Sequence, residues 1–217
     1  MCVDRFSYSD ARPGGVGLTH GLAELQWTDR RDPEEDPMHA PTKARYTYSD
    51  YLATPEDSSR RYEIVDGELF VTASPRFRHQ EIVVNIGHVL AALSIEHDLG
   101  KVATGPTVRL RDDMVMEPDL VFLRADRLGL IESGRIHGPP DLVVEVLSPS
   151  NRGFDRSLKR SRYLEYGVPE VWIVDPDAET VEVWRSGAAG RTVTKGSFEW
   201  QVGERTLGIA LAEIFRG

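Results

Sequence analysis

The chain has 217 residues, 40% of them hydrophobic and 28% charged, so it can bury a full core, and we expect one α/β or α+β domain. Its formal net charge of -9 argues against a protein that coats nucleic acid through its global charge, but it leaves open an enzyme that meets phosphates through a local basic patch and metal ions. The single cysteine, Cys2, excludes a disulfide framework and a cysteine-type zinc site.

The N-terminal stretch 1–37 has little hydrophobic periodicity and is rich in Gly, Pro and acidic residues. We expect a poorly ordered extension, either a genuine tail or residues upstream of a natural start at Met38, followed by a single domain at 38–217. No apolar run approaches the roughly 18 residues that a membrane-spanning helix needs. The chain also lacks a basic-then-apolar signal pattern. These features predict a cytoplasmic protein without a membrane partner.

Helical and strand-like periodicities alternate along the rest of the chain. The dipeptide Asp66-Gly67 between two apolar-alternating runs predicts a β-hairpin, Ser49 predicts a helix start, and Gly100 predicts a helix stop. In chain order we expect a helix at 49–52, strands at 61–65 and 68–73, a helix at 77–98, a strand at 101–111, a strand pair at 114–123, a short helix at 125–131, a strand at 142–147, a helix at 155–166, strands at 171–174 and 180–185, a hairpin near 187–190 and a helix at 211–215. This order predicts a mixed sheet with helices on its faces.

One predicted strand carries a carboxylate where the pattern calls for apolar residues. Glu145 interrupts the strand 142–147, which is otherwise apolar on both faces, as is typical of a central strand covered by helices. A carboxylate is costly to bury unless it is paired, hydrogen-bonded or bound to a cation. Upstream, Asp119 stands at the start of another apolar strand. Two acids on neighbouring strands are the simplest partners for a divalent metal ion.

Several motifs between residues 45 and 215 resemble a known family. They are YEIVDGE at 62–68, His79-Gln80, PDLV at 118–121, PDLVVEVLSPS at 140–150, Lys159 and YGVPEVW at 166–172. Together they closely resemble the Uma-type restriction endonuclease family of the PD-(D/E)XK nuclease superfamily. The resemblance implies a restriction-endonuclease-like fold, with a mixed β-sheet core flanked by helices and extra β-hairpins. It also implies a metal-dependent endonuclease that acts on DNA.

The resemblance further implies which residues form the site. By position, Asp119 and Glu145 match the two acidic metal ligands, and the backbone carbonyl of Val146 is a further candidate ligand. Mg²⁺ or Mn²⁺ suits such oxygen donors. The superfamily pattern places a lysine two residues beyond the second acid, where this chain has Leu147. Lys159 on the following helix is the replacement that we expect, although it could instead form a surface i,i+4 pair with Asp155.

Two further residues are candidates with open alternatives. Glu63 could be a third acid that faces the site, or it could lie on the solvent face of its strand. The matched pattern suggests a catalytic role for His79, whereas the alternative is an ordinary histidine on a helix. Because adjacent carboxylates repel each other, we also expect alanine at Asp119 or Glu145 to leave the protein at least as stable.

Two functions from different classes follow. The first is a metal-dependent endonuclease-like phosphodiesterase with Asp119, Glu145, Lys159, Glu63 and His79 in its site. The second is a catalytically silent nuclease-fold module that binds nucleic acid or protein, which the absence of a lysine at position 147 favours. A homodimer is compatible with either function.

Overall fold

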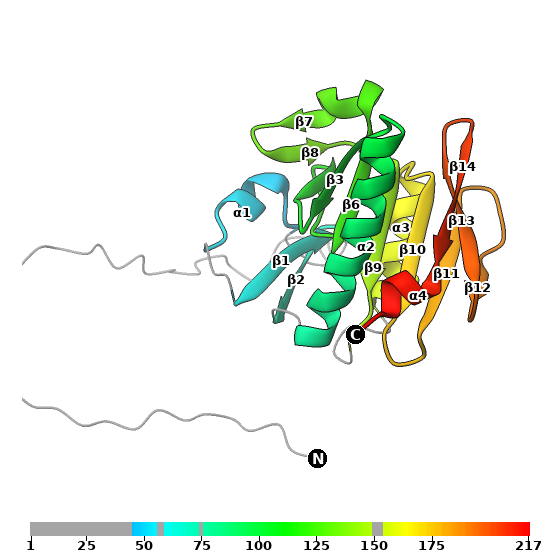
Figure 1. The fold of residues 1–217 in the computed structure, drawn as a ribbon. Helices are drawn as coiled ribbons and strands as arrows, with labels where there is room; N and C mark the ends of the chain where they lie inside the picture. The colour runs from blue at the N-terminus through cyan, green and yellow to red at the C-terminus, as the bar shows by residue number, and fades with distance from the viewer. Residues whose placement is uncertain (1–44, 56–58, 74–75, 149–153) are drawn as a thin grey trace, which may run out of the picture. The chain divides into compact units, whose positions relative to one another are not determined.

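The computed structural model describes residues 45–55, 59–73, 76–148 and 154–217, without the side chains of 154–156 (Figure 1). The predicted extension at 1–37 lies outside the described residues. The described residues form two six-stranded mixed sheets and a two-stranded hairpin, with helices packed against them. This arrangement confirms the predicted fold class. No helix in the described ranges has the length and apolar character needed to span a membrane.

The elements have the following bounds. In chain order they are α1 (Tyr48–Leu52), β1 (Arg60–Val65), β2 (Glu68–Ala73), α2 (Phe77–Glu96), β3 (Gly100–Thr104), β4 (Val108–Arg111), β5 (Met114–Met116), β6 (Leu120–Arg124), the 3-10 helix η1 (Ala125–Leu130), β7 (Ile131–Glu132), β8 (Arg135–His137), β9 (Leu142–Val146), the π-helix η2 (Phe154–Lys159), α3 (Arg160–Glu165), β10 (Glu170–Asp175), β11 (Thr180–Arg185), β12 (Arg191–Val193), β13 (Ser197–Val202), β14 (Arg205–Ala210) and α4 (Leu211–Phe215).

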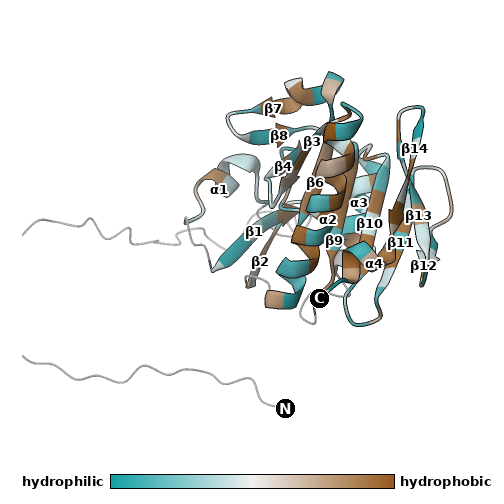
Figure 2. Cartoon of the chain, viewed as in Figure 1, coloured by the Kyte–Doolittle hydropathy of each residue, from teal (hydrophilic) through white to brown (hydrophobic). Residues whose placement is uncertain are grey.

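The sheet that carries the site has the strand order β12-β11-β10-β9-β6-β3. Its strand β9 is buried along its whole length and pairs with β10 in parallel and with β6 in antiparallel fashion. Figure 2 shows β6 and β9 as mostly hydrophobic. This is what a strand apolar on both faces predicts, since each face must pack against another layer.

Two layers cover this sheet. On one face, α2 packs with the β13–β14 hairpin and α4 around a core that includes Ile86, Trp172 and Trp200. On the other face, α3 and the second sheet, ordered β2-β1-β5-β4-β8-β7, share a core that includes Met116 and Tyr163. The central sheet therefore lies between helix α2 and a layer that contains β1, β5 and α3 (Figure 1).

Most predicted elements are confirmed, and the differences have local causes. The single strand predicted at 101–111 is wrong, because Gly105 at φ 58° breaks it into β3 and β4, which lie in different sheets. Ser49 is not the cap of α1, since Thr47 takes that position and forms a capping box with Asp50. The short strands β7 and β8 and the β13–β14 hairpin were not predicted.

Gly100 opens β3 and offers a sharp test of the fold. Its φ of 151° suits glycine, and a Cβ atom there would overlap the carbonyl oxygen of Leu123 and lie 2.8 Å from Cα of Arg124. Gly100→Ala is therefore expected to lower the free energy of unfolding by about 3 kcal/mol or more, measured by urea denaturation. Gly87→Ala in α2 is the matched control, since its Cβ would meet only side chains, at 3.5 Å or more. Equal free energies of unfolding for Gly100→Ala and Gly87→Ala would show that the backbone contacts at Gly100 do not exclude a Cβ atom.

Candidate active site

The two acids predicted as metal ligands lie side by side on neighbouring strands. Asp119 immediately precedes β6, and Glu145 is the next-to-last residue of β9. The antiparallel ladder pairs Leu120 with Val144, so Asp119 and Glu145 occupy the next opposed position along it. Contacts from β1, α2 and η2 reach the same end of the sheet. The structure thus brings together the five predicted site residues, Glu63, His79, Asp119, Glu145 and Lys159.

Asp119 is 2% exposed, and donors of this chain engage both of its carboxylate oxygens. Oδ1 accepts a hydrogen bond from Arg61 Nη1 at 2.6 Å, while Oδ2 lies 3.0 Å from His79 Nε2 and 2.9 Å from the backbone nitrogen of Val146. Burial alone raises the pKa of Asp119, but the hydrogen bonds and charges of His79 and Arg61 outweigh it, so this pKa lies below its usual value. Asp119 is therefore ionised at neutral pH.

Asp119, Arg61 and His79 form one group of charged and polar side chains, and Lys159 forms a second group with Glu63 and Glu145. Its Nζ lies 2.9 Å from Glu63 Oε1 and 2.7 Å from Glu145 Oε1, and its side chain is 3% exposed. The interpretation of Lys159 as half of a surface pair is wrong, because a surface lysine would keep its ammonium in water. Glu63, at 4% exposure, does not lie on a solvent face either.

Two neighbours orient these carboxylates. The Tyr163 hydroxyl donates to Glu145 Oε1 at 2.7 Å, and burial together with the charge of Glu145 raises the pKa of Tyr163 well above its usual value. The backbone N–H of Glu117 donates to Glu63 Oε1 at 2.8 Å. Each carboxylate that contacts Lys159 thus has a second, uncharged donor that fixes its orientation.

Arg61 links the two groups of charges. Arg61 contacts Asp119 directly, and the negative charges of Asp119, Glu145 and Glu63 raise the pKa of Arg61 above its usual value although burial opposes them. Sequence reasoning missed this residue and Tyr163. The spacing in the sequence could have identified both residues. Arg61 lies two residues before Glu63 and therefore on the same strand face, and Tyr163 lies one helical turn beyond Lys159.

His79 contributes an unusual buried nitrogen. The ring is 5% exposed, and an ionised Asp119 only accepts hydrogen bonds, so Nε2 carries the donated proton. The other nitrogen, Nδ1, is buried and has no hydrogen-bond partner among the described residues. Such an atom is costly to bury unless a ligand or water molecule satisfies it.

The site contains carboxylate oxygens, the donor type that hard divalent cations prefer. The carboxylates of Glu63, Glu117, Asp119 and Glu145 outnumber the two permanent cations, Arg61 and Lys159, and burial raises the pKa of Glu117 above its usual value. Carboxylate oxygens are the preferred ligands of Mg²⁺ and Mn²⁺. Within the described residues, however, no three His, Cys, Asp or Glu side chains gather closely enough to hold an ion. The shared metal ion, with the Val146 carbonyl as an additional ligand, therefore stays a prediction.

The geometry also argues against a stability gain from alanine at Asp119. Its carboxylate is surrounded by donors, so its removal would leave Arg61, His79 and the Val146 N–H without an acceptor. Unpaired buried donors are costly. We therefore expect Asp119→Ala to lower the free energy of unfolding, the opposite of the expectation from carboxylate repulsion alone.

Comparisons with known proteins agree with this architecture. The chain is similar at 20% identity to the crystal structure of a "putative nuclease belonging to DUF820" from Anabaena variabilis, with a TM-score of 0.66 over 78% of this chain and 97% of that chain. No curated protein matches. The model of the Uma2 family, described as "Putative restriction endonuclease", matches residues 48–212. That match covers most of the chain and includes every candidate site residue, so the protein belongs to the Uma2 family and shares its nuclease-type character.

Proposed function

We propose that the protein is a metal-dependent endonuclease that hydrolyses phosphodiester bonds in DNA. The observation that carries the proposal is the buried ammonium of Lys159, held by Glu63 and Glu145 beside the ionised Asp119. Buried charges at this density are costly for stability, and perturbed ionisable groups cluster at functional sites. Membership of a nuclease-type family supports the same reaction class.

Each residue has a role that follows from its position. A Mg²⁺ or Mn²⁺ ion bound by Asp119 and Glu145 would activate a water molecule and neutralise charge on the leaving oxygen. Lys159 supplies a fixed positive charge for the phosphoryl oxygens, on which negative charge develops during attack. Glu63 holds that ammonium in place. Arg61, whose side chain is 25% exposed, can hold Asp119 through one nitrogen and offer its other donors to a phosphate.

One observation favours the second function, a silent nuclease-fold module that binds nucleic acid or protein. Protein donors already engage both oxygens of Asp119, and Lys159 and Arg61 lie among the acids. Ion pairs of this kind satisfy buried carboxylates without a metal ion. The two functions differ in whether a divalent cation can compete with these ion pairs.

A cleavage assay separates the two functions. Supercoiled plasmid and single-stranded DNA are incubated with the protein in Mg²⁺ or Mn²⁺, and we expect cleavage that Asp119→Asn lowers by about 100-fold or more, because one charged group at the reacting phosphate has an effect of this size.

The matched control is Asp141→Asn. Asp141 precedes β9, at the end opposite Glu145, and is bound by Arg127 Nη1 at 2.8 Å. This variant should cleave like the parent. If the parent cleaves neither substrate with either metal but retains DNA on a filter, the interaction module replaces the endonuclease.

A further inference from the structure

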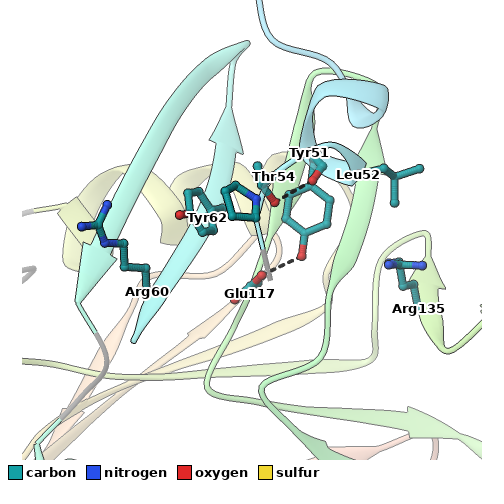
Figure 3. Close-up of a pocket in the computed structure, with 8 residues that line it drawn as sticks. Tyr51, Leu52, Thr54, Arg60, Tyr62, Glu117 and Arg135 are labelled. Atoms are coloured by element: carbon teal, nitrogen blue, oxygen red, sulfur yellow. Dashed lines mark hydrogen bonds between the residues drawn. The ribbon is translucent and has the colours of Figure 1, made fainter. Parts of the chain in front are cut away.

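A pocket of about 220 Å³ lies next to the carboxylate site and is not explained by it. Tyr51, Arg60, Tyr62, Glu117 and Arg135 contribute to its lining. Figure 3 shows Arg60 and Arg135 at opposite ends of this group, with the two tyrosine rings between them. The pocket thus combines the Arg135 side chain at one end with aromatic surface in the middle (Figure 3).

Strand β1 supplies both the pocket and the site. Successive side chains of a strand point to opposite faces, so Arg60 and Tyr62 lie on one face while Arg61 and Glu63 lie on the other. The first pair lines the pocket, and the second pair contacts Asp119 and Lys159. One strand therefore separates the pocket from the site.

The pocket on one face of β1 and the site on the other come into contact near the start of this strand. Among the described residues, the ladder between β1 and β5 consists of one pair, Ile64 with Val115, so residues 60–62 extend beyond the end of β5. Glu117, just past that end, touches both sides. Its backbone N–H donates to Glu63, while its side chain lines the pocket and accepts the Tyr51 hydroxyl at 2.6 Å.

Arg135 is the feature that points to a ligand. Its side chain is half-buried, yet no residue in the described ranges forms a hydrogen bond or ion pair with it. By contrast, Arg109 and Arg111 of the same sheet pair with Asp112 and Asp113. The guanidinium of Arg135 opposes the rise in the pKa of Tyr51 that burial and Glu117 produce, so its charge is felt within the pocket. Its guanidinium is therefore available to pair with an anionic group.

The size and lining narrow the class of ligand. The pocket is smaller than the roughly 300–1,000 Å³ of sites that enclose a whole small molecule, so it suits one unit of a longer chain. Tyrosine rings stack on nucleobases, the Glu117 carboxylate can accept from base N–H groups, and arginines bind phosphates.

We propose that this pocket holds one unpaired nucleotide of the nucleic-acid strand that the neighbouring site engages, with its base against Tyr62 and a phosphate at Arg135. The inference rests on the proposed function for the identity of the strand, but it does not require cleavage. A base can enter the pocket only when it is unpaired. The pocket therefore predicts a preference for single-stranded or locally opened nucleic acid.

Binding is tested by fluorescence anisotropy with a labelled thymidine oligonucleotide of roughly ten nucleotides, in EDTA so that no cleavage occurs. Arg135→Gln is expected to weaken binding by about 5- to 10-fold and to reduce its salt dependence, as loss of one phosphate contact does. Tyr62→Leu, which keeps an apolar side chain, should weaken binding by about fivefold or more. Arg205→Gln on the exposed start of β14 is the matched control and should bind like the parent.

Two outcomes would overturn the proposal. If Arg135→Gln and Tyr62→Leu, both folded by circular dichroism, bind the oligonucleotide as tightly as the Arg205→Gln control, the pocket takes no part in binding. If thymidine monophosphate in large excess displaces the oligonucleotide from the parent, and the Arg135→Gln variant has lost its affinity for it, the pocket is a site for a free nucleotide instead. A parent that binds through Arg135 but never cleaves leaves this inference standing and rejects the endonuclease alone.

Discussion

Replacement of Lys159 by methionine is expected to lower the free energy of unfolding by about 3–5 kcal/mol, because it leaves two buried carboxylates without the cation that they share. Glu63 and Glu145 are 4% and 2% exposed, so water cannot replace the ammonium. Methionine keeps most of the side-chain volume, and the loss therefore reports on charge rather than on packing. Urea denaturation at neutral pH measures it.

Two further variants identify the cause. Lys101→Met on the exposed surface of β3 is the matched control and should change the free energy of unfolding by at most about 0.5 kcal/mol. Adding Glu145→Gln to Lys159→Met removes one of the two carboxylate charges that have lost Lys159, so the double variant should be more stable than Lys159→Met alone. A Lys159→Met protein as stable as the Lys101→Met control would show that the ion pairs contribute nothing.

The same substitution tests catalysis. If Lys159 stabilises charge that develops on the phosphate, Lys159→Met should lower the turnover number by about 100-fold or more at temperatures where it remains folded. Lys159→Arg keeps the charge but moves the donors, so partial activity is expected. Full activity of either variant would remove Lys159 from the site.

The sequence predicted the strands that carry the acids better than the partners of those acids. Glu145 was recognisable because it interrupts a run that is apolar on both faces, and the ladder between β6 and β9 then places Asp119 opposite it. The burial of Lys159 could not be predicted in the same way. The spacing between Lys159 and Asp155 suits a solvent-exposed helix as well as a buried one. Only the packing of the helix against β1 and β9 shows that Glu63 and Glu145 surround Lys159.

The other differences between the predictions and the structure arise from contacts between residues that are far apart in the sequence. Residues 101–111 alternate like one strand, and the change of sheet at Gly105 depends on packing against two different layers. The sequence does not distinguish Arg61 from other polar strand residues, because its role depends on the contact between β1 and Asp119. A homodimer, which is compatible with either function, concerns a second chain and is not tested by these contacts.

Calorimetry with Mn²⁺ tests whether Asp119 and Glu145 share one cation. The two residues occupy opposed positions on neighbouring strands, where the carboxylates of the site outnumber its permanent cations, Arg61 and Lys159. We therefore expect the parent to bind Mn²⁺, and Asp119→Asn and Glu145→Gln each to weaken this binding by about tenfold or more, since each removes a ligand charge. Binding is measured without DNA, so that it is independent of cleavage.

The control for this experiment is Glu170→Gln. Glu170 is also buried, at 3% exposure, and is paired with Arg185 and Trp172, so the variant loses a buried carboxylate that has no contact with Asp119 or Lys159. Its Mn²⁺ affinity should match that of the parent even if its stability falls. If all three variants bind Mn²⁺ like the parent, the acids do not share a cation, and the ion pairs to Arg61 and Lys159 are what makes their burial tolerable. If only Asp119→Asn and Glu145→Gln lose affinity, the metal ion competes successfully with those ion pairs, as an endonuclease of this design requires.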